Sequence, residues 1–297
     1  MKIRVGLGLG TQNFPASDQV AALGTELESL GFDSLWLSER LNGGTFDPVV
    51  SMAYLAGACP KLKFGTSVLV LPGRNPAILA KELATLDQLS HGRLLLAMGL
   101  GVVDPIEQLA FGVERTARAR IFDEALPLLR RMWQEDHVSH EGEHFHYQDL
   151  SIHPKPVQHP LEVWLGGMAP SELRRTGRLG DGWLPSTCTP AEAAAGRELV
   201  QQAATEAGRI VDPEHFGASI TYVEGEIPEA LAKRVTRRRP DADPRDIIPM
   251  GLPAARTLME RFVDVGFSKF VIRPARDPSA WGPELRRIAD VVLPIQN

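Results

Sequence analysis

Apolar positions along the chain follow two periods, and glycine marks the change from one to the other. Between Val20 and Leu30, leucine and valine recur every three or four residues, which places one apolar stripe on a helix. Gly31 follows, and residues 32–37 then form a short apolar run that is typical of a buried strand. Because glycine readily adopts the left-handed conformation that ends helices, this pattern predicts a helix, a glycine cap and a strand.

The same joint occurs three more times, at Gly92, Gly180 and Gly266. Eight buried strands are predicted in all, at residues 4–9, 34–38, 63–71, 93–99, 162–166, 182–186, 217–223 and 269–273. Their apolar runs are nearly continuous, as is usual for parallel strands covered on both faces. Eight strand and helix units in 297 residues match an α/β fold, the TIM (β/α)8 barrel. An open doubly wound sheet is the alternative, but the glycines of residues 6–10 lack the last glycine of its phosphate-binding motif.

Two stretches do not follow the repeat and are predicted to be insertions in a single domain that spans residues 1–297. Residues 137–160 form the insertion after the fourth predicted strand and carry short polar strands. Residues 212–253 form the insertion associated with the seventh and contain the basic run 233–239. The loops that follow the carboxyl ends of barrel strands carry function, so the second insertion is a candidate lid.

Composition and charge exclude several classes of protein. Hydrophobic residues make up 43% of the chain and charged residues 23%, which is near the globular norm. A net charge of −5 gives no reason to expect a nucleic-acid partner. The two cysteines, Cys59 and Cys188, indicate neither a disulfide framework nor a zinc site, so we expect a cytoplasmic protein. The apolar stretch 94–103 is half as long as a membrane span, and the start of the chain lacks a signal-peptide core, so no membrane partner is expected.

Glycines directly after predicted strands are the strongest candidates for a binding site. Gly99 and Gly101 follow one strand, and Gly166 and Gly167 follow the next. A backbone without side chains lets a ligand approach closely, and free amides at the start of the following helix could hold a phosphate. Turn glycines that let helices pack on the barrel are the alternative. The histidines of residues 137–159 are predicted to be solvated residues of a hairpin, and no metal site is expected.

Four ordered segments resemble the bacterial luciferase-like monooxygenase family: residues 30–39, 64–101, 153–167 and 173–183. They are most similar to its branch that uses the 5-deazaflavin coenzyme F420. The four motifs together are specific for the family, and they separate deazaflavin from FMN much less well. The family fold is a TIM barrel, in agreement with the strand count.

The resemblance implies a flat tricyclic cofactor in the mouth of the barrel. Ser67 and Val68 match the positions of a non-proline cis peptide that supports the ring, and Gly99 and Gly101 would border the ring. Ser186 matches a further polar contact. The stretch whose amides hold the cofactor phosphate is matched by Gly166, Gly167, Met168 and Ala169. Two tryptophans of these motifs, Trp36 and Trp183, are candidates for the core.

The sequence departs from the family where an acid and base pair is expected. Many relatives have an acidic residue followed by histidine after the second strand, whereas Glu39 is followed by Arg40 here. Arg40 could orient or neutralise an anion, but it stays protonated and cannot act as a general acid. Glu39 and Arg40 are therefore the candidate catalytic residues. Asp104 and Glu107 are possible substitutes for the missing acid or base.

We therefore expect an oxidoreductase that transfers hydride between coenzyme F420 and a small organic substrate. An FMN-dependent monooxygenase fed by a separate reductase is one alternative, and a barrel that binds a flavin or metabolite without turnover is another. The family resemblance also implies a possible homodimer through outer helices. The basic run 233–239 is either a lid that attracts the anionic tail of the deazaflavin or a solvated helix face neutralised by Asp241, Asp243 and Asp246.

Overall fold

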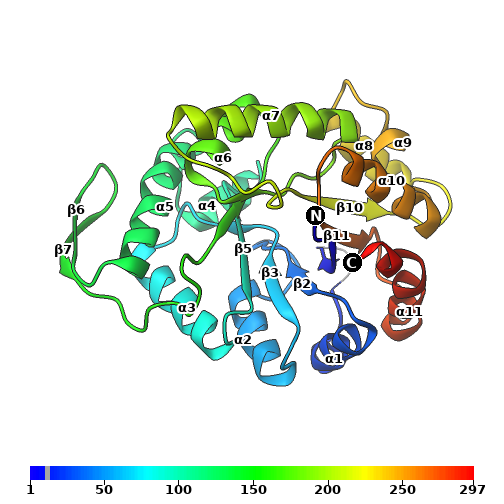
Figure 1. Cartoon of the computed structure of the whole chain (residues 1–297), viewed down its shortest axis with the longest axis horizontal. Helices are drawn as coiled ribbons and strands as arrows, with labels where there is room; N and C mark the ends of the chain where they lie inside the picture. Colours follow the sequence, from blue (N-terminus) through cyan, green and yellow to red (C-terminus); the bar gives the residue numbers. More distant parts are fainter. Residues whose placement is uncertain (11–13) are drawn as a thin grey trace.

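The predicted strands lie side by side in one parallel sheet that curves into a barrel (Figure 1). The computed structural model describes residues 1–10 and 14–297. Isolated parallel bridges join Trp183 to Phe216 and Ser186 to Ser219, and they close the sheet on itself. The TIM barrel prediction is confirmed. Hydrogen-bonded neighbours follow the order β10 (Gly217–Tyr222), β11 (Lys269–Pro274), β1 (Arg4–Leu9), β2 (Ser34–Leu37), β3 (Lys63–Thr66), β5 (Leu94–Gly99), β8 (Val163–Leu165) and β9 (Gly182–Trp183).

Helices cover the outside of the barrel (Figure 1). Their apolar faces supply the outer part of the core, which packs between helices and sheet. In chain order they are η1 (Ser17–Gln19), α1 (Val20–Leu30), α2 (Pro48–Ala58), α3 (Pro76–Leu89), α4 (Pro105–Phe111), α5 (Arg118–Gln134), α6 (Pro170–Leu179), α7 (Pro190–Glu206), α8 (Glu229–Arg238), α9 (Pro244–Ile247), α10 (Leu252–Asp264), α11 (Trp281–Val292) and η2 (Leu293–Ile295).

The third predicted strand, residues 63–71, is divided in two. β3 ends at Thr66, and β4 (Leu69–Val70) resumes pairing with β5. At the break, the Thr66 hydroxyl donates to the Ala97 carbonyl at 2.9 Å and accepts from the Ala97 amide at 3.1 Å, so a side chain replaces the ladder hydrogen bonds. A cis peptide bond joins Ser67 and Val68, as the family resemblance implied. The prediction of one continuous strand here is wrong.

Three of the four predicted glycine caps are left-handed. Gly31 has φ of 86°, Gly92 of 75° and Gly266 of 88°, a region that favours glycine. Gly180 has φ of −84° and an extended conformation, so a left-handed cap is wrong at this position. Its amide donates to the Thr176 carbonyl at 2.7 Å, and the chain then runs directly into β9.

The two predicted insertions differ in their place on the barrel. The first contains an antiparallel hairpin, β6 (Val138–Glu141) and β7 (His146–Leu150), which projects beyond α5 (Figure 1). It connects α5 to the start of β8, and so it does not follow the carboxyl end of a strand. In the second stretch, α8 and α9 follow the carboxyl end of β10. Only this second segment can contribute to a site at the mouth of the barrel.

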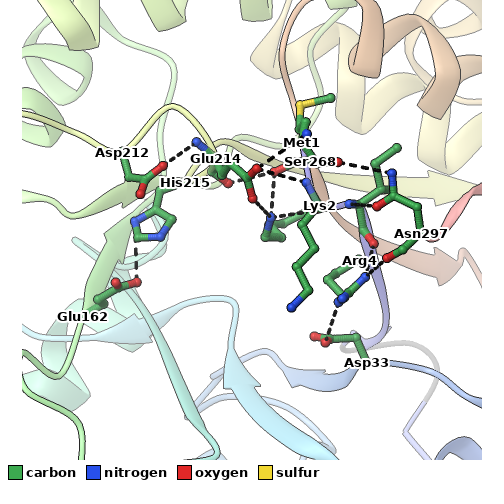
Figure 2. Close-up of polar contacts among 12 residues, drawn as sticks. Met1, Lys2, Arg4, Asp33, Glu162, Asp212, Glu214, His215, Ser268 and Asn297 are labelled. Atoms are coloured by element: carbon green, nitrogen blue, oxygen red, sulfur yellow. Dashed lines mark hydrogen bonds and ion pairs between the residues drawn. The ribbon is translucent and has the colours of Figure 1, made fainter.

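A polar network surrounds the amino ends of β1 and β11 (Figure 2). The Glu214 carboxylate accepts from the Lys2 amide at 3.1 Å, and it lies 3.7 Å from both the Met1 amino group and Lys269 Nζ. Beside it, Arg4 Nε lies 3.6 Å from Asp33 Oδ1. Side chains at this end of a TIM barrel stabilise the fold, whereas ligands bind at the opposite end.

Two indole rings fill the inside of the barrel where the strands carry glycine. Trp36 and Trp164 belong to a small interior cluster that also contains Ala97, Leu184 and Val271. Trp183, by contrast, packs outside the sheet against Phe216 and Phe267, with ring centroids 6.5 and 5.8 Å away. Both sequence candidates for the core, Trp36 and Trp183, are therefore buried core residues.

A buried carboxylate ties α3 to the segment that leads into β8. Asp87 is fully buried, and its two oxygens accept from the Gln158 amide at 2.9 Å and from Gln158 Nε2 at 2.7 Å. We predict that Asp87→Ala lowers the free energy of unfolding by about 2 to 4 kcal/mol, because two partly buried donors lose a buried carboxylate acceptor. Urea unfolding measures this change. Glu82→Ala, an exposed site on the same helix, is the control, and an equal effect of both substitutions would contradict the prediction.

Candidate functional site

A cavity of about 930 Å³ opens at the carboxyl ends of the strands. This size is at the upper end of the range for small-molecule sites and accommodates a cofactor together with a small substrate. Nine of the eleven predicted site residues line the cavity: Glu39, Arg40, Ser67, Val68, Gly99, Gly101, Gly166, Gly167 and Ser186. Among the residues that the structure describes, Met168 and Ala169 are the two candidates that do not line it.

Glu39 forms a buried ion pair at the end of β2. The Arg74 guanidinium donates to one carboxylate oxygen, and the Val70 amide donates to the other at 2.6 Å. Arg74 Nε also donates to the Val70 carbonyl at 3.0 Å, so the pair holds β4 against the end of β2. Burial raises the pKa of Glu39, and Arg74 and the Val70 hydrogen bond oppose this shift.

Arg40 is neutralised by the two carboxylates that were considered as substitutes for the catalytic acid. Its Nε donates to Glu107 Oε1 at 2.6 Å, and one terminal nitrogen donates to Asp104 Oδ2 at 3.4 Å. Glu107 is buried and also accepts from the Asn42 amide at 3.1 Å. Asp104 caps α4 through the Ile106 amide at 2.9 Å. Asp104 and Glu107 therefore have structural partners, and Arg40 is a fixed cation at the rim of the cavity.

The amides predicted to hold a phosphate already bind a carboxylate of the chain itself. Met168 and Ala169 donate their amide hydrogens to Glu172 Oε2, each at 3.0 Å. The expectation that these amides are free is wrong. The sequence carries the signal that was missed, because a glutamate three residues after the helix cap commonly binds the cap amides. The carbonyl of the preceding Gly167 accepts from Trp183 Nε1 at 2.9 Å, which ties this loop to the core.

Sequence reasoning missed Arg273, which projects from β11 into the cavity. One of its terminal nitrogens lies 3.3 Å from Ser67 Oγ and 3.2 Å from Ser219 Oγ, and donates to both hydroxyls. Gly8 makes room for this side chain, since a Cβ at Gly8 would lie 3.1 Å from Arg273 Nε. Burial, with a smaller effect from Arg234, lowers the pKa of Arg273 to about 10. A charged residue at the end of a predicted buried strand was the available signal.

The basic run divides into two groups. Arg239 pairs with Glu192 and Asp241, and Lys233 pairs with Glu229 at 2.6 Å along α8. Of the three aspartates expected to neutralise the run, Asp241 pairs with Arg239, whereas Asp243 caps α9 through the Arg245 amide. Two other members of the run line the cavity, namely Arg234 and Arg237. The second group matches the expectation of a basic segment over the barrel mouth.

The family model of the luciferase-like monooxygenases matches residues 1–260, and the chain belongs to this family. The F420-dependent glucose-6-phosphate dehydrogenase of Kineococcus radiotolerans is 30% identical over 61% of this chain and 56% of its own length. The phthiodiolone/phenolphthiodiolone dimycocerosates ketoreductase of Mycobacterium kansasii is 31% identical over 60% of this chain and 56% of its own length. The chain thus spans just over half the length of these curated relatives.

Solved structures share the fold across the whole chain. An F420-dependent secondary alcohol dehydrogenase in complex with an F420-acetone adduct superposes with a TM-score of 0.82, at 20% identity and 100% coverage of both chains. The oxygenating constituent of 3,6-diketocamphane monooxygenase from Pseudomonas putida, in complex with FMN, has a TM-score of 0.79 at 19% identity, covering 100% of this chain and 99% of that one. At such identities the likeness concerns the fold. Within the described residues, no helix is long and apolar enough to span a membrane.

The raised pKa of Glu39 predicts a pH effect on stability. The folded chain keeps the Glu39 proton to a higher pH than the unfolded chain. Ionisation of Glu39 therefore lowers the stability of the folded chain as the pH rises above 4.5, the ordinary pKa of a glutamate. Glu39→Gln removes the titration. We predict that the variant gains stability relative to the wild type as the pH rises from 4 to 8, measured by urea unfolding.

Glu82→Gln is the matched control, because Glu82 is exposed, and its difference from the wild type should stay flat over this range. A variant at position 39 that loses stability relative to the wild type with rising pH would show that the Arg74 pair outweighs the effect of burial.

Proposed function

We propose that this protein is an oxidoreductase that transfers hydride between coenzyme F420 and a small organic substrate in the barrel cavity. One observation carries the proposal: the Val68 side chain packs directly against the glycine backbone of Gly99 and Gly166 at the wall of the cavity. A Cβ at Gly99 would lie 2.8 Å from Val68 Cγ2, and one at Gly166 would lie 3.5 Å from Val68 Cγ1. Glycines at these points let Val68 pack closely on the backbone, which leaves a wall without other side chains for a flat ring. The F420-dependent relatives support the choice of a deazaflavin.

The residues present fit this cofactor. Glu172 already places a carboxylate oxygen on the amides of Met168 and Ala169, so this helix start accommodates an anionic oxygen. We propose that the cofactor phosphate would replace the Glu172 carboxylate at these two amides. Gly166, Gly167 and Ser186 would make further contacts with the cofactor. Arg234 and Arg237 of α8 line the cavity and would hold the anionic tail of the cofactor. When bound, the deazaflavin supplies the hydride chemistry.

We also propose Glu39 and Arg40 as the catalytic pair. Both line the cavity at the end of β2. A carboxyl whose pKa is raised by burial can hold a proton closer to neutral pH, which suits Glu39 to proton transfer. Arg40, held by Glu107 and Asp104, supplies a fixed positive charge. We propose as well that residues 1–297 form a single domain. The two cysteines are buried and unpaired, which is consistent with a cytoplasmic protein.

Parallel fluorescence titrations with coenzyme F420 and FMN test the cofactor. We predict that F420 binds at least tenfold more tightly than FMN. We also predict that Gly166→Val weakens F420 binding at least tenfold, because a Cβ fits there at ordinary contact distances and the added methyl groups narrow the cavity. Gly57→Val, on the exposed surface of α2 with no atom within 4 Å of the new Cβ, is the control.

Comparable, weak binding of both cofactors would leave the F420 proposal without support, and tighter binding of FMN would favour the monooxygenase alternative. Turnover is measured separately, as oxidation of reduced F420 in the presence of a panel of small ketones and aldehydes. Tight F420 binding without turnover of any panel member would favour a barrel that only binds the cofactor.

We propose further that two copies of the chain associate through α2 and α3, which pack against each other. Val50 and Tyr54, one helical turn apart on α2, are 70% and 58% exposed, and Ile78 on α3 is 59% exposed. Apolar side chains gathered on neighbouring helices are typical of a protein interface. This arrangement leaves the barrel mouth of each copy open.

Light scattering after size exclusion tests the dimer. We predict a mass of twice 32.5 kDa for the wild type and of 32.5 kDa for the double variant Val50→Asp, Tyr54→Asp, because burying two carboxylates in an apolar interface is costly. Ile210→Asp changes a residue that is 90% exposed outside these helices and should leave the mass unchanged. A monomeric wild type would refute the proposal.

A further inference from the structure

Arg273 brings a positive charge into the cavity, and within the described residues no carboxylate forms an ion pair with it. Its two hydrogen-bond acceptors, Ser67 Oγ and Ser219 Oγ, are neutral hydroxyls. Its Nε is buried and has no hydrogen-bond partner within residues 1–10 and 14–297. The charged group that acts most directly on it is another cation, Arg234. The guanidinium thus keeps an unused donor at the wall of the cavity.

The carboxylates that line the cavity already have partners other than Arg273. Glu39 pairs with Arg74, Asp104 pairs with Arg40, and Glu172 accepts the amides at the start of α6. The arginines exceed them in number, although the whole chain carries a net charge of −5. The charged lining consists of three acidic residues, Glu39, Asp104 and Glu172, and five arginines, Arg40, Arg175, Arg234, Arg237 and Arg273.

An unpaired cation in a partly buried position is unfavourable for folding, because it gives up hydration without gaining a counter-charge. Such groups persist mainly at functional sites, where a ligand supplies the missing partner. The planar guanidinium presents donors along one edge, which match two oxygens of a carboxylate or phosphate. The flanking hydroxyls of Ser67 and Ser219 can donate to the same oxygens. These three side chains form a preorganised anion site.

We propose that Arg273, with Ser67 and Ser219, binds an anionic oxygen group of the substrate, and that the substrate is therefore an organic carboxylate or phosphate. This inference rests on the proposed function, since it assumes that the substrate shares the cavity with the deazaflavin. Ser67 directly precedes Val68, the residue whose side chain packs against Gly99 and Gly166 at the wall of the cavity. An anion on Arg273 therefore lies beside the wall proposed to support the cofactor ring, and orients the rest of the substrate toward it.

The test uses acetate and inorganic phosphate as probes, titrated calorimetrically into the full chain at constant ionic strength. Each titration is run with saturating F420 and without it. The wild type is expected to bind at least one probe saturably in both conditions, and Arg273→Gln is expected to weaken this binding at least tenfold. Arg245→Gln removes an equal charge from an exposed position on α9 and should change the affinity less than twofold. The affinity of each variant for F420 is measured in parallel and should not change.

Absence of saturable anion binding by the wild type, or equal anion affinity in Arg273→Gln, would overturn the proposal. Loss of F420 affinity in Arg273→Gln, with anions competing against F420, would also overturn it by assigning the anionic group to the cofactor. If F420 fails to bind but the anion affinity still depends on Arg273, the anion site stands and only the proposed function fails.

Thermal unfolding separates a binding role from a structural one. A cation without a counter-charge contributes little to the fold, so Arg273→Gln should unfold at the same temperature as the wild type or higher. If Arg273→Gln unfolds at a lower temperature, anion binding is measured with Arg273→Lys instead. This variant keeps the positive charge but loses the planar pair of donors. It should weaken anion binding several-fold, and unchanged affinity in this variant would count against the site.

Discussion

The site depends on how the inside of the barrel is filled. Trp36 lies over the glycines of β1 and β3, where a Cβ at Gly65 would lie 2.5 Å from Trp36 Cε3 and one at Gly6 would lie 2.8 Å from Cδ1. Trp164 occupies the equivalent space above Gly182. Two large rings can close the interior only because the neighbouring strands carry glycine at the positions beside them. The filled interior forms a floor, and the remaining space is left at the carboxyl ends as the cavity.

Charge pairing then decides which groups at this mouth stay available. One Glu39 oxygen accepts a hydrogen bond from Arg74 and the other accepts one from the Val70 amide. These contacts fix β4 beside the break after β3. Arg40 is similarly fixed by Glu107. Rigid pairs of this kind hold Glu39 and Arg40 in fixed positions, with part of each charge balanced by its partner. Arg273, whose side-chain hydrogen bonds within the described residues go to neutral hydroxyls, is different, because its charge remains open to a ligand.

The sequence predicts the barrel well, because buried parallel strands are continuous apolar runs and glycine ends most of the helices between them. It also predicts most of the cavity, since residues directly after such strands meet at one end of the barrel. What it could not predict depends on long-range pairing. The Thr66 hydroxyl replaces ladder bonds to a strand about 30 residues away, and Arg40 meets Glu107 across 67 positions. Glu172 is the exception, because its cap is local and the spacing already carried the signal.

The replacement of histidine by Arg40 changes what the site can do. An arginine held by two carboxylates cannot exchange a proton, so the end of β2 retains Glu39 alone as an ionisable acid. Hydride transfer depends above all on a close, oriented encounter between donor and acceptor, with water excluded. A fixed Arg40 after β2 and an open Arg273 on β11, two strands away in the sheet, serve orientation more than acid catalysis. Under the proposed function, this arrangement suits a substrate that is held by its charge during hydride transfer.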